Sequence, residues 1–209
     1  MLFSLWIKIE EKRHITREKV NYLEILKNRQ IWLFAVMLGF YVASELGVGN
    51  WFVTFLSKWY GMGRTESSVY LSIFFATFTF GRLFGGFLVE KIGYRKSLVL
   101  FSMLASTLIF LGISFKKLAV LISLSGFFYS IIFPTVIAVI MKSFRKYTTP
   151  IIGITITTAS TINMIANFLI GKLNDIYGVF AGFSATLVFM LIVFLISLIV
   201  YKREKRVVP

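Results

Sequence analysis

The sequence predicts an all-α integral membrane protein in which six transmembrane helices form an inverted repeat of three plus three. Of its 209 residues, 57% are hydrophobic and only 15% are charged, which is too little charge to cover a soluble globule. Six apolar stretches are each long enough for a membrane helix, which takes roughly 20 residues. A glycine-containing pattern recurs once at the same spacing, as a repeated unit requires.

The first 30 residues precede these stretches. Residues 1–9 are apolar but too short to cross a bilayer, and we interpret them as the end of a truncated span. Residues 10–30 are polar and of mixed charge, with Leu23, Ile25 and Leu26 as their few apolar positions. We predict a cytoplasmic central loop that contains a short surface helix.

The six-helix transmembrane domain is predicted over residues 31–201, followed by a basic cytoplasmic tail at 202–209. Its spans cover residues 31–57, 67–89, 97–115, 118–141, 151–171 and 179–201. Only Lys116 and Lys117 separate the third span from the fourth, so these two spans form a tight antiparallel hairpin. Aromatic residues of the kind that anchor at membrane interfaces lie near the span ends: Trp51, Trp59, Tyr60, Tyr94, Tyr147 and Tyr201.

Lys and Arg are distributed unequally between the two sides of the membrane. Most of them precede the first span or lie after the second, the fourth and the sixth. The other side carries Lys58, Arg64, Lys116, Lys117 and Lys172. Under the positive-inside rule this predicts a multi-pass protein of the cell (plasma) membrane, surrounded by lipid, with both termini cytoplasmic.

The net charge of +14 would indicate nucleic acid in a soluble protein, but here the cations lie in short segments between apolar spans. We therefore predict no nucleic-acid partner. Cysteine is absent and there is one histidine, which excludes disulfides and thiolate metal sites. Without a nucleotide-binding or zinc-protease motif, we expect no cofactor, no metal and no enzymatic activity.

The segment 81–98, which we call the elbow, joins the second span to the third. Gly81, Gly85 and Gly86 remove side-chain bulk, so this helix can pack closely on a neighbour in lipid. The apolar run then ends at Glu90, and the turn is charged at the positions Glu90, Lys91, Arg95 and Lys96. We predict a cytoplasmic turn.

Part of the elbow recurs later in the chain. The pattern Gly-x-Leu-x-Glu-x-x-Gly at 86–93 returns as Gly-x-Leu-x-Asp-x-x-Gly at 171–178, with every position offset by 85 residues. The second copy follows the fifth span and thus lies on the opposite side of the membrane. This predicts two repeats of three helices with inverted topology.

The elbow from Gly86 to Lys96 resembles the loop signature GxLxDxxGxRK of the major facilitator superfamily, with Glu90 in place of the usual Asp. Residues 41–51, YVASELGVGNW, are similar to the seventh helix of fucose-permease-like and related sugar symporters, and residues 125–135 resemble their tenth helix. The resemblance implies the carboxy-terminal six-helix half of such a transporter. It also implies a partner, either a missing amino-terminal half or a second copy.

The resemblance implies a conformational role for the elbow. Its acidic and basic residues would latch one half of the transporter to the other, with Glu90 and Arg95 at the matching positions. The residues of this motif are Arg82, Gly86, Glu90, Gly93, Arg95 and Lys96. A structural role for Arg82 near the end of its span is an alternative to substrate contact.

Glu45 is the strongest candidate for the substrate and proton pathway. It lies about midway along the first span with no basic residue near it in sequence, and an ionisable group at that depth faces a cavity or a partner. Tyr41, Gly49 and Phe52 share its helical face, whereas Asn50 is rotated away from it. The alternative is a buried structural carboxyl group, and Asn50 could equally cap the outer end.

Other polar residues could line the same pathway. Ser160, Asn163 and Asn167 form a stripe on the fifth span, which suits either a hydroxyl-rich substrate or hydrogen bonds between helices. Pro134 is expected to kink the fourth span and place Tyr129 near the bend.

These features predict a secondary active transporter, incomplete alone, that carries a sugar or another small polar solute with protons. The alternatives are an exporter of drugs or hydrophobic solutes from the same superfamily, which the 23 Phe residues keep open, and a non-transporting membrane fragment or scaffold.

Overall fold

The structure is a computed structural model that describes residues 21–204, and side chains up to residue 202. The predicted truncated span at 1–9, most of the predicted loop and the last five residues of the tail lie outside the described part. Within it, the short helix α1 (Tyr22–Lys27) begins after Asn21, whose side chain accepts a hydrogen bond from the Glu24 amide. It matches the surface helix expected in the loop.

Six long helices follow and confirm the predicted all-helical membrane fold. They are α2 (Arg29–Trp59), α3 (Arg64–Ile92), α4 (Tyr94–Ser114), α5 (Val120–Ser143), α6 (Thr148–Tyr177) and α7 (Val179–Glu204). Each is long and apolar enough to cross a membrane. Most extend a few residues past the predicted apolar spans, because polar flanking residues continue the helix; α2, for example, begins after Asn28, which caps the Gln30 amide at 2.9 Å.

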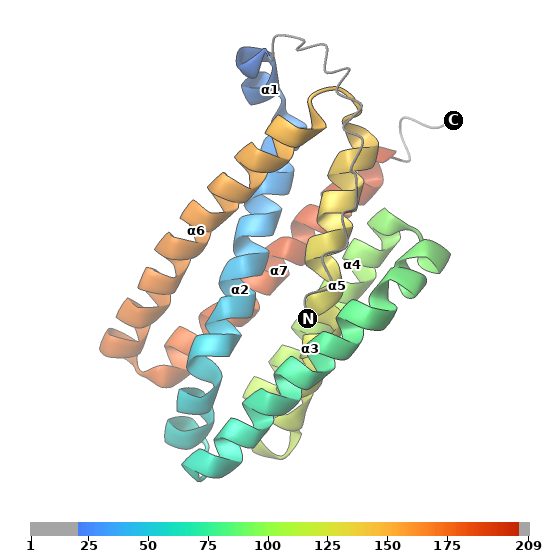
Figure 1. The fold of residues 1–209 in the computed structure, drawn as a ribbon. Coiled ribbons are helices and arrows are strands. Elements are labelled where there is room, and N and C mark those ends of the chain that lie inside the picture. Colours follow the sequence, from blue (N-terminus) through green and yellow to red (C-terminus); the bar gives the residue numbers. More distant parts are fainter. Residues whose placement is uncertain (1–20, 205–209) are drawn as a thin grey trace, which may run out of the picture.

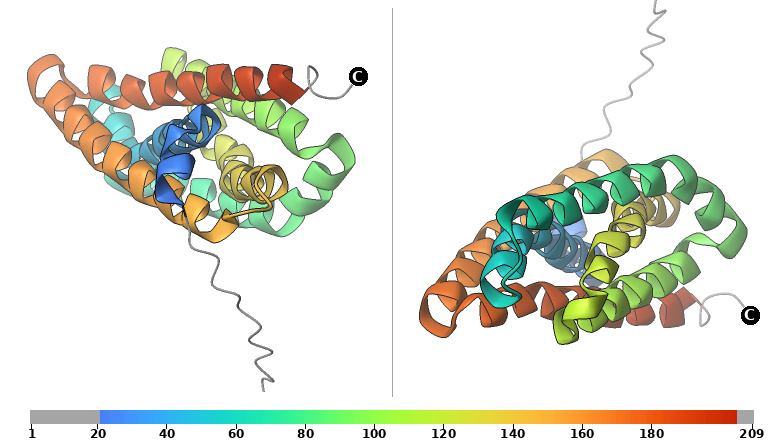
Figure 2. Two further views of the ribbon diagram at one scale, coloured as in Figure 1. Left: turned by 90° about the horizontal axis from the view of Figure 1, so that it is seen from above. Right: turned by 90° about the horizontal axis from the view of Figure 1, so that it is seen from below.

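The helices form two layers (Figure 1). One layer contains α6, α2, α5 and α3 in that order across the bundle, and the other contains α7 and α4 behind α2 and α5. Figure 2 shows the same two layers from both ends of the bundle. The short helix η1 (Lys116–Leu118) joins α4 to α5 and forms the tight hairpin expected there.

The contacts between helices follow the predicted inverted repeat. Helix α3 packs on α5 as α6 packs on α2, and α4 packs on α5 as α7 packs on α2. Gly93 and Gly178, which occupy matching positions of the two sequence patterns, end α3 and α6 with φ of 94° and 83°. The next helix begins at the following residue in both cases. The shared backbone geometry explains why both positions hold glycine.

The contact between α3 and α5 is the closest in the bundle because glycines lie on both helices. A Cβ atom at Gly126 would overlap the Phe74 carbonyl, and one at Gly81 would overlap the Phe127 carbonyl. Two hydrogen bonds also cross this contact. The Thr77 hydroxyl donates to the Ser123 carbonyl, and the Ser123 hydroxyl donates to the Tyr70 carbonyl, both at 2.7 Å.

Helices α3 and α6 stand at the two flanks of the front layer and are poorly covered. Only 22% of the most apolar window of each is buried, against 61% for α2. Large apolar side chains are exposed on both, including Phe84 and Phe87 on α3 and Met164 and Phe168 on α6. Lipid or a second protein surface must therefore cover these flanks.

Replacing Gly81 by Ala is expected to destabilise the bundle by about 1–3 kcal/mol, because the added methyl group overlaps the α5 backbone. Gly86→Ala is the matched control on the same helix, since nothing lies within 4 Å of a Cβ atom there. Thermal unfolding of both variants in detergent measures the effect. Equal midpoints would contradict the close contact between α3 and α5.

Candidate functional site

A buried group of hydroxyls joins three helices at the centre of the bundle. The Ser44 hydroxyl on α2 donates to the Thr186 carbonyl on α7 at 2.6 Å. Its oxygen lies 2.6 Å from the Tyr129 hydroxyl on α5. Because a hydroxyl has one proton to donate, Tyr129 is the donor in this second bond. Ser44 therefore fixes α2 against both α5 and α7, a role that its sequence position did not indicate.

Aromatic rings surround this group. The ring centroids of Tyr41 and Tyr129 lie 6.1 Å apart, and those of Tyr129 and Phe74 lie 5.9 Å apart. Phe133 also contacts Tyr41 at 6.4 Å. Tyr41 and Tyr129 are both fully buried. They thus form a packed wall between α2 and α5 rather than an exposed lining.

Glu45 lies near the middle of α2, one helical turn beyond Tyr41, and is half-buried. The Tyr41 hydroxyl is buried, makes no hydrogen bond of standard geometry, and has Glu45 as its main electrostatic neighbour. Among the other acidic residues of the described long helices, Glu66, Glu90 and Asp175 lie within a few residues of a helix end. Glu45 is therefore the carboxyl group placed deepest in the bundle.

Arg82 on α3 is the cation whose field acts on Glu45. Its guanidinium carbon lies 5.0 Å from the centroid of the Phe78 ring, in a cation–π contact. Ten residues separate Arg82 from the end of α3, a depth of about 15 Å at 1.5 Å per residue. The sequence did not relate Arg82 to Glu45, because only the packing of α3 beside α2 brings the two charges together.

The predicted helical face of α2 is confirmed by burial. Phe52 and Tyr41 are buried, Glu45 and Gly49 are half-buried, and Asn50 is exposed. Asn50 therefore projects away from the face that carries Glu45.

The polar stripe on α6 has a local arrangement. The Asn167 side-chain amide donates to the side-chain oxygen of Asn163 at 2.6 Å, within the same helix. Asn174 lies on the same helical face and packs against Gly182 of α7. Ser160 is exposed, and both asparagines of the predicted stripe are half-buried.

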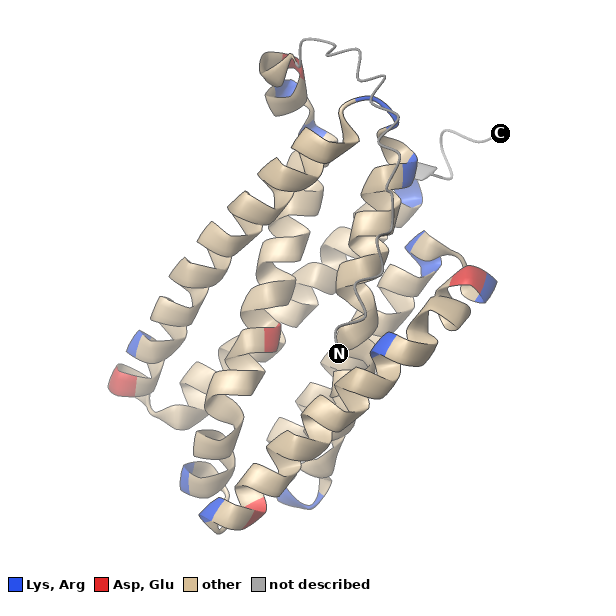
Figure 3. Cartoon of the chain, in the orientation of Figure 1, with Lys and Arg blue, Asp and Glu red and all other residues tan. Residues whose placement is uncertain are grey.

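The elbow residues lie together at one end of the bundle, which we call the elbow end. Arg82, Gly86 and Glu90 line a groove of about 230 Å³ between α3 and α5, along which Pro134 is also placed. Gly93 makes the turn, and Arg95 donates to the Ser143 hydroxyl on α5 at 3.3 Å. Lys96 is exposed. Figure 3 shows basic residues at this end and fewer at the other.

Comparison with known proteins decides the family. A family model described as Major Facilitator Superfamily matches residues 31–209, which include all six long helices. The chain belongs to the major facilitator superfamily. It is therefore a multi-pass membrane protein of a transporter family, and the six helices correspond to half of a major facilitator fold.

Two curated relatives are similar to this major facilitator chain. A protein named putative glucose/galactose transporter from Helicobacter pylori is 25% identical over 155 residues, 73% of this chain. A protein named bypass of stop codon protein 6 from Saccharomyces cerevisiae is 29% identical over 76 residues, 36% of this chain. The matched stretches span 38% and 15% of the lengths of these two relatives, respectively.

Replacing Ser44 by Ala is expected to destabilise the protein by about 1–3 kcal/mol, because it leaves the buried Tyr129 hydroxyl and Thr186 carbonyl without their partner. Ser57→Ala on the same helix is the control, since Ser57 bonds only to the Thr54 carbonyl one turn away. Chemical denaturation in detergent compares the two. A Ser44→Ala protein as stable as the control would show that the three-helix contact contributes little.

Proposed function

We propose that this chain is the carboxy-terminal half of a secondary active transporter that carries a sugar or another small polar solute together with protons. The observation that carries the proposal is the placement of Glu45 near the middle of α2, beside Tyr41 and within the field of Arg82. Ionisable groups at that depth are costly in lipid and mark ion or substrate pathways. A carboxyl group there can take up a proton on one side of the membrane and release it on the other.

The proposal requires a second half because six helices offer one wall of a pathway. Substrate in such transporters lies near the membrane midplane between two repeats or halves that move about it. Arg82 is exposed at a depth where lipid tails cannot solvate a guanidinium group, and α3 and α6 are poorly covered on either side of it. A second half, or a second copy of this chain, would enclose this face and exclude lipid.

A polar substrate is supported by two features. One relative is named a putative glucose/galactose transporter. The amides of Asn163 and Asn167 and the exposed amide of Asn50 each offer a donor and an acceptor, which suits hydroxyl-rich solutes. We propose that the elbow end is cytoplasmic and that the protein resides in the plasma membrane, because Lys and Arg are concentrated at the elbow end.

Glu45→Gln is expected to abolish proton uptake driven by a sugar gradient, since the amide is nearly isosteric but cannot exchange a proton. The measurement uses a pH-sensitive dye inside vesicles that contain the assembled transporter. Glu66→Gln, an exposed carboxyl group in the first turn of α3, is the matched control and is expected to keep full coupling. Proton uptake that is unchanged by Glu45→Gln would exclude this residue as the coupling group.

Sugar uptake is expected only when a second half is present. The chain is expressed in cells that lack their own hexose uptake, either alone or together with the coding DNA upstream of Met1. Uptake by the chain alone at the full rate would favour a pair of identical copies. Absence of uptake in both cases, with the protein present in the membrane, would contradict the proposed sugar transport.

A further inference from the structure

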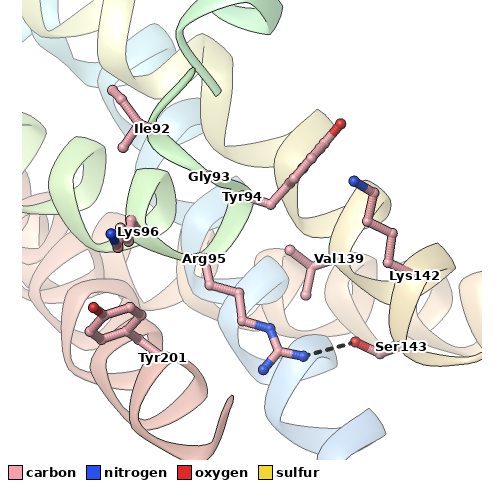
Figure 4. A pocket seen from close by; sticks show the side chains of 9 residues that line it. All are labelled: Ile92, Gly93, Tyr94, Arg95, Lys96, Val139, Lys142, Ser143 and Tyr201. Carbon is pink, nitrogen blue, oxygen red and sulfur yellow. Dashed lines mark hydrogen bonds between the residues drawn. The ribbon is translucent and has the colours of Figure 1, made fainter. Parts of the chain in front are cut away.

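A cavity at the elbow end opens between the first turn of α4 and the last turns of α5 and α7 (Figure 4). Its volume is about 500 Å³. Nine residues line it, and three of them are basic: Arg95 and Lys96 from α4 and Lys142 from α5. No acidic side chain occurs among the nine lining residues, all of which belong to the described part of the chain. The cavity is therefore suited to an anion.

Polar contacts hold the basic side chains in place around the cavity. Arg95 donates to the Ser143 hydroxyl at 3.3 Å, and the Lys142 ammonium lies 3.5 Å from the centroid of the Tyr94 ring. Figure 4 shows Arg95 and Ser143 at one side and Lys96 beside Tyr201 at the other. A ligand with several acceptor oxygens, such as a phosphate group, could accept hydrogen bonds from more than one of these donors.

The two helices that carry Lys96 and Tyr201 also form an apolar groove further along the bundle. This second cavity of about 270 Å³ is lined by Met103, Ser106, Thr107, Phe110, Leu187, Leu191 and Phe194. Lys96 lies on the same face of α4 as Met103 and Phe110, at i, i+7 and i+14. Tyr201 lies on the same face of α7 as Phe194 at the same spacing. The basic cavity and the apolar groove therefore follow one line between α4 and α7.

The distance along this line matches one leaflet of a membrane. From Lys96 to Met103 is about 10 Å and from Lys96 to Phe110 about 21 Å, at 1.5 Å per residue. Half of a hydrocarbon core is about 15 Å thick. An acyl chain that descends from a headgroup at Lys96 would thus enter the groove within its own leaflet.

We propose that this line binds one anionic phospholipid. The phosphate lies among Arg95, Lys96 and Lys142, and an acyl chain lies in the groove between α4 and α7. Basic pockets between transmembrane helices are a known way to bind anionic headgroups, and an acyl groove continuous with the pocket distinguishes a lipid from a soluble phosphate. Because Gly93 and Arg95 belong to the elbow, a bound lipid would brace the turn between α3 and α4 against α5 and α7.

The test measures lipid binding to the purified full chain by native mass spectrometry, with phosphatidylglycerol and phosphatidylcholine added in parallel. The double variant Lys96→Gln with Lys142→Gln is expected to bind phosphatidylglycerol about 25-fold more weakly, roughly fivefold for each lysine removed. Its control is Lys116→Gln with Lys117→Gln, which removes the same charge at the other end of the bundle. The control is expected to retain binding, and phosphatidylcholine is expected to bind weakly to all variants.

Two further arms separate a lipid from a soluble anion. Thr107→Trp fills the apolar groove and is expected to weaken phosphatidylglycerol binding, whereas Val188→Trp, exposed on α7 outside the groove, is not. Glycerol 1-phosphate, which has the headgroup chemistry without acyl chains, is expected not to displace the lipid. Size-exclusion elution and helical circular dichroism verify that each variant is folded.

Two results would overturn the proposal. In the first, the Lys96 and Lys142 double variant binds phosphatidylglycerol as well as the control does. In the second, glycerol 1-phosphate competes fully and Thr107→Trp has no effect, which would assign the cavity to a soluble phosphate. Both outcomes are independent of whether the chain transports sugar.

Discussion

The structure depends on one constraint: the membrane interior offers no hydrogen bonds, so each polar group must find a partner in the protein. The backbone meets this requirement within six helices, and most hydroxyls do so within their own helix, as Thr79 does with the Phe75 carbonyl. The exceptions bond between helices. Ser44, Thr77 and Ser123 direct their hydroxyls to neighbouring helices, and these bonds fix how α2, α3, α5 and α7 pack.

The same constraint separates the centre of the front layer from its flanks. Helices α2 and α5 are enclosed by neighbours and carry the packed tyrosines, whereas α3 and α6 leave most of their surface uncovered. Charges placed on the uncovered side of such a bundle need water or protein nearby. Arg82 and Glu45 are such charges, and their presence distinguishes this face from one that only lipid covers.

The inverted repeat gives the bundle two related but unequal halves. Gly93 and Gly178 make the same turn at opposite ends, yet only the turn at Gly93 carries a cluster of basic residues and a cavity. The repeat thus supplies a common scaffold, and the charges placed on it distinguish the two ends. In a membrane with more anionic lipid on one face, this asymmetry fixes orientation and favours specific lipid contacts.

The sequence by itself determined the six spans, the short helix before them, the hairpin at Lys116 and the repeat of the Gly93 turn. Apolar length and glycine spacing are local properties that hydrocarbon enforces directly. It also placed Glu45 on one face of α2. Only the tertiary structure decided that Ser44 joins three helices, that Tyr41 and Tyr129 are packed together, and that Arg82 acts on Glu45. These relations join residues far apart in the chain, and helix packing alone sets which faces meet.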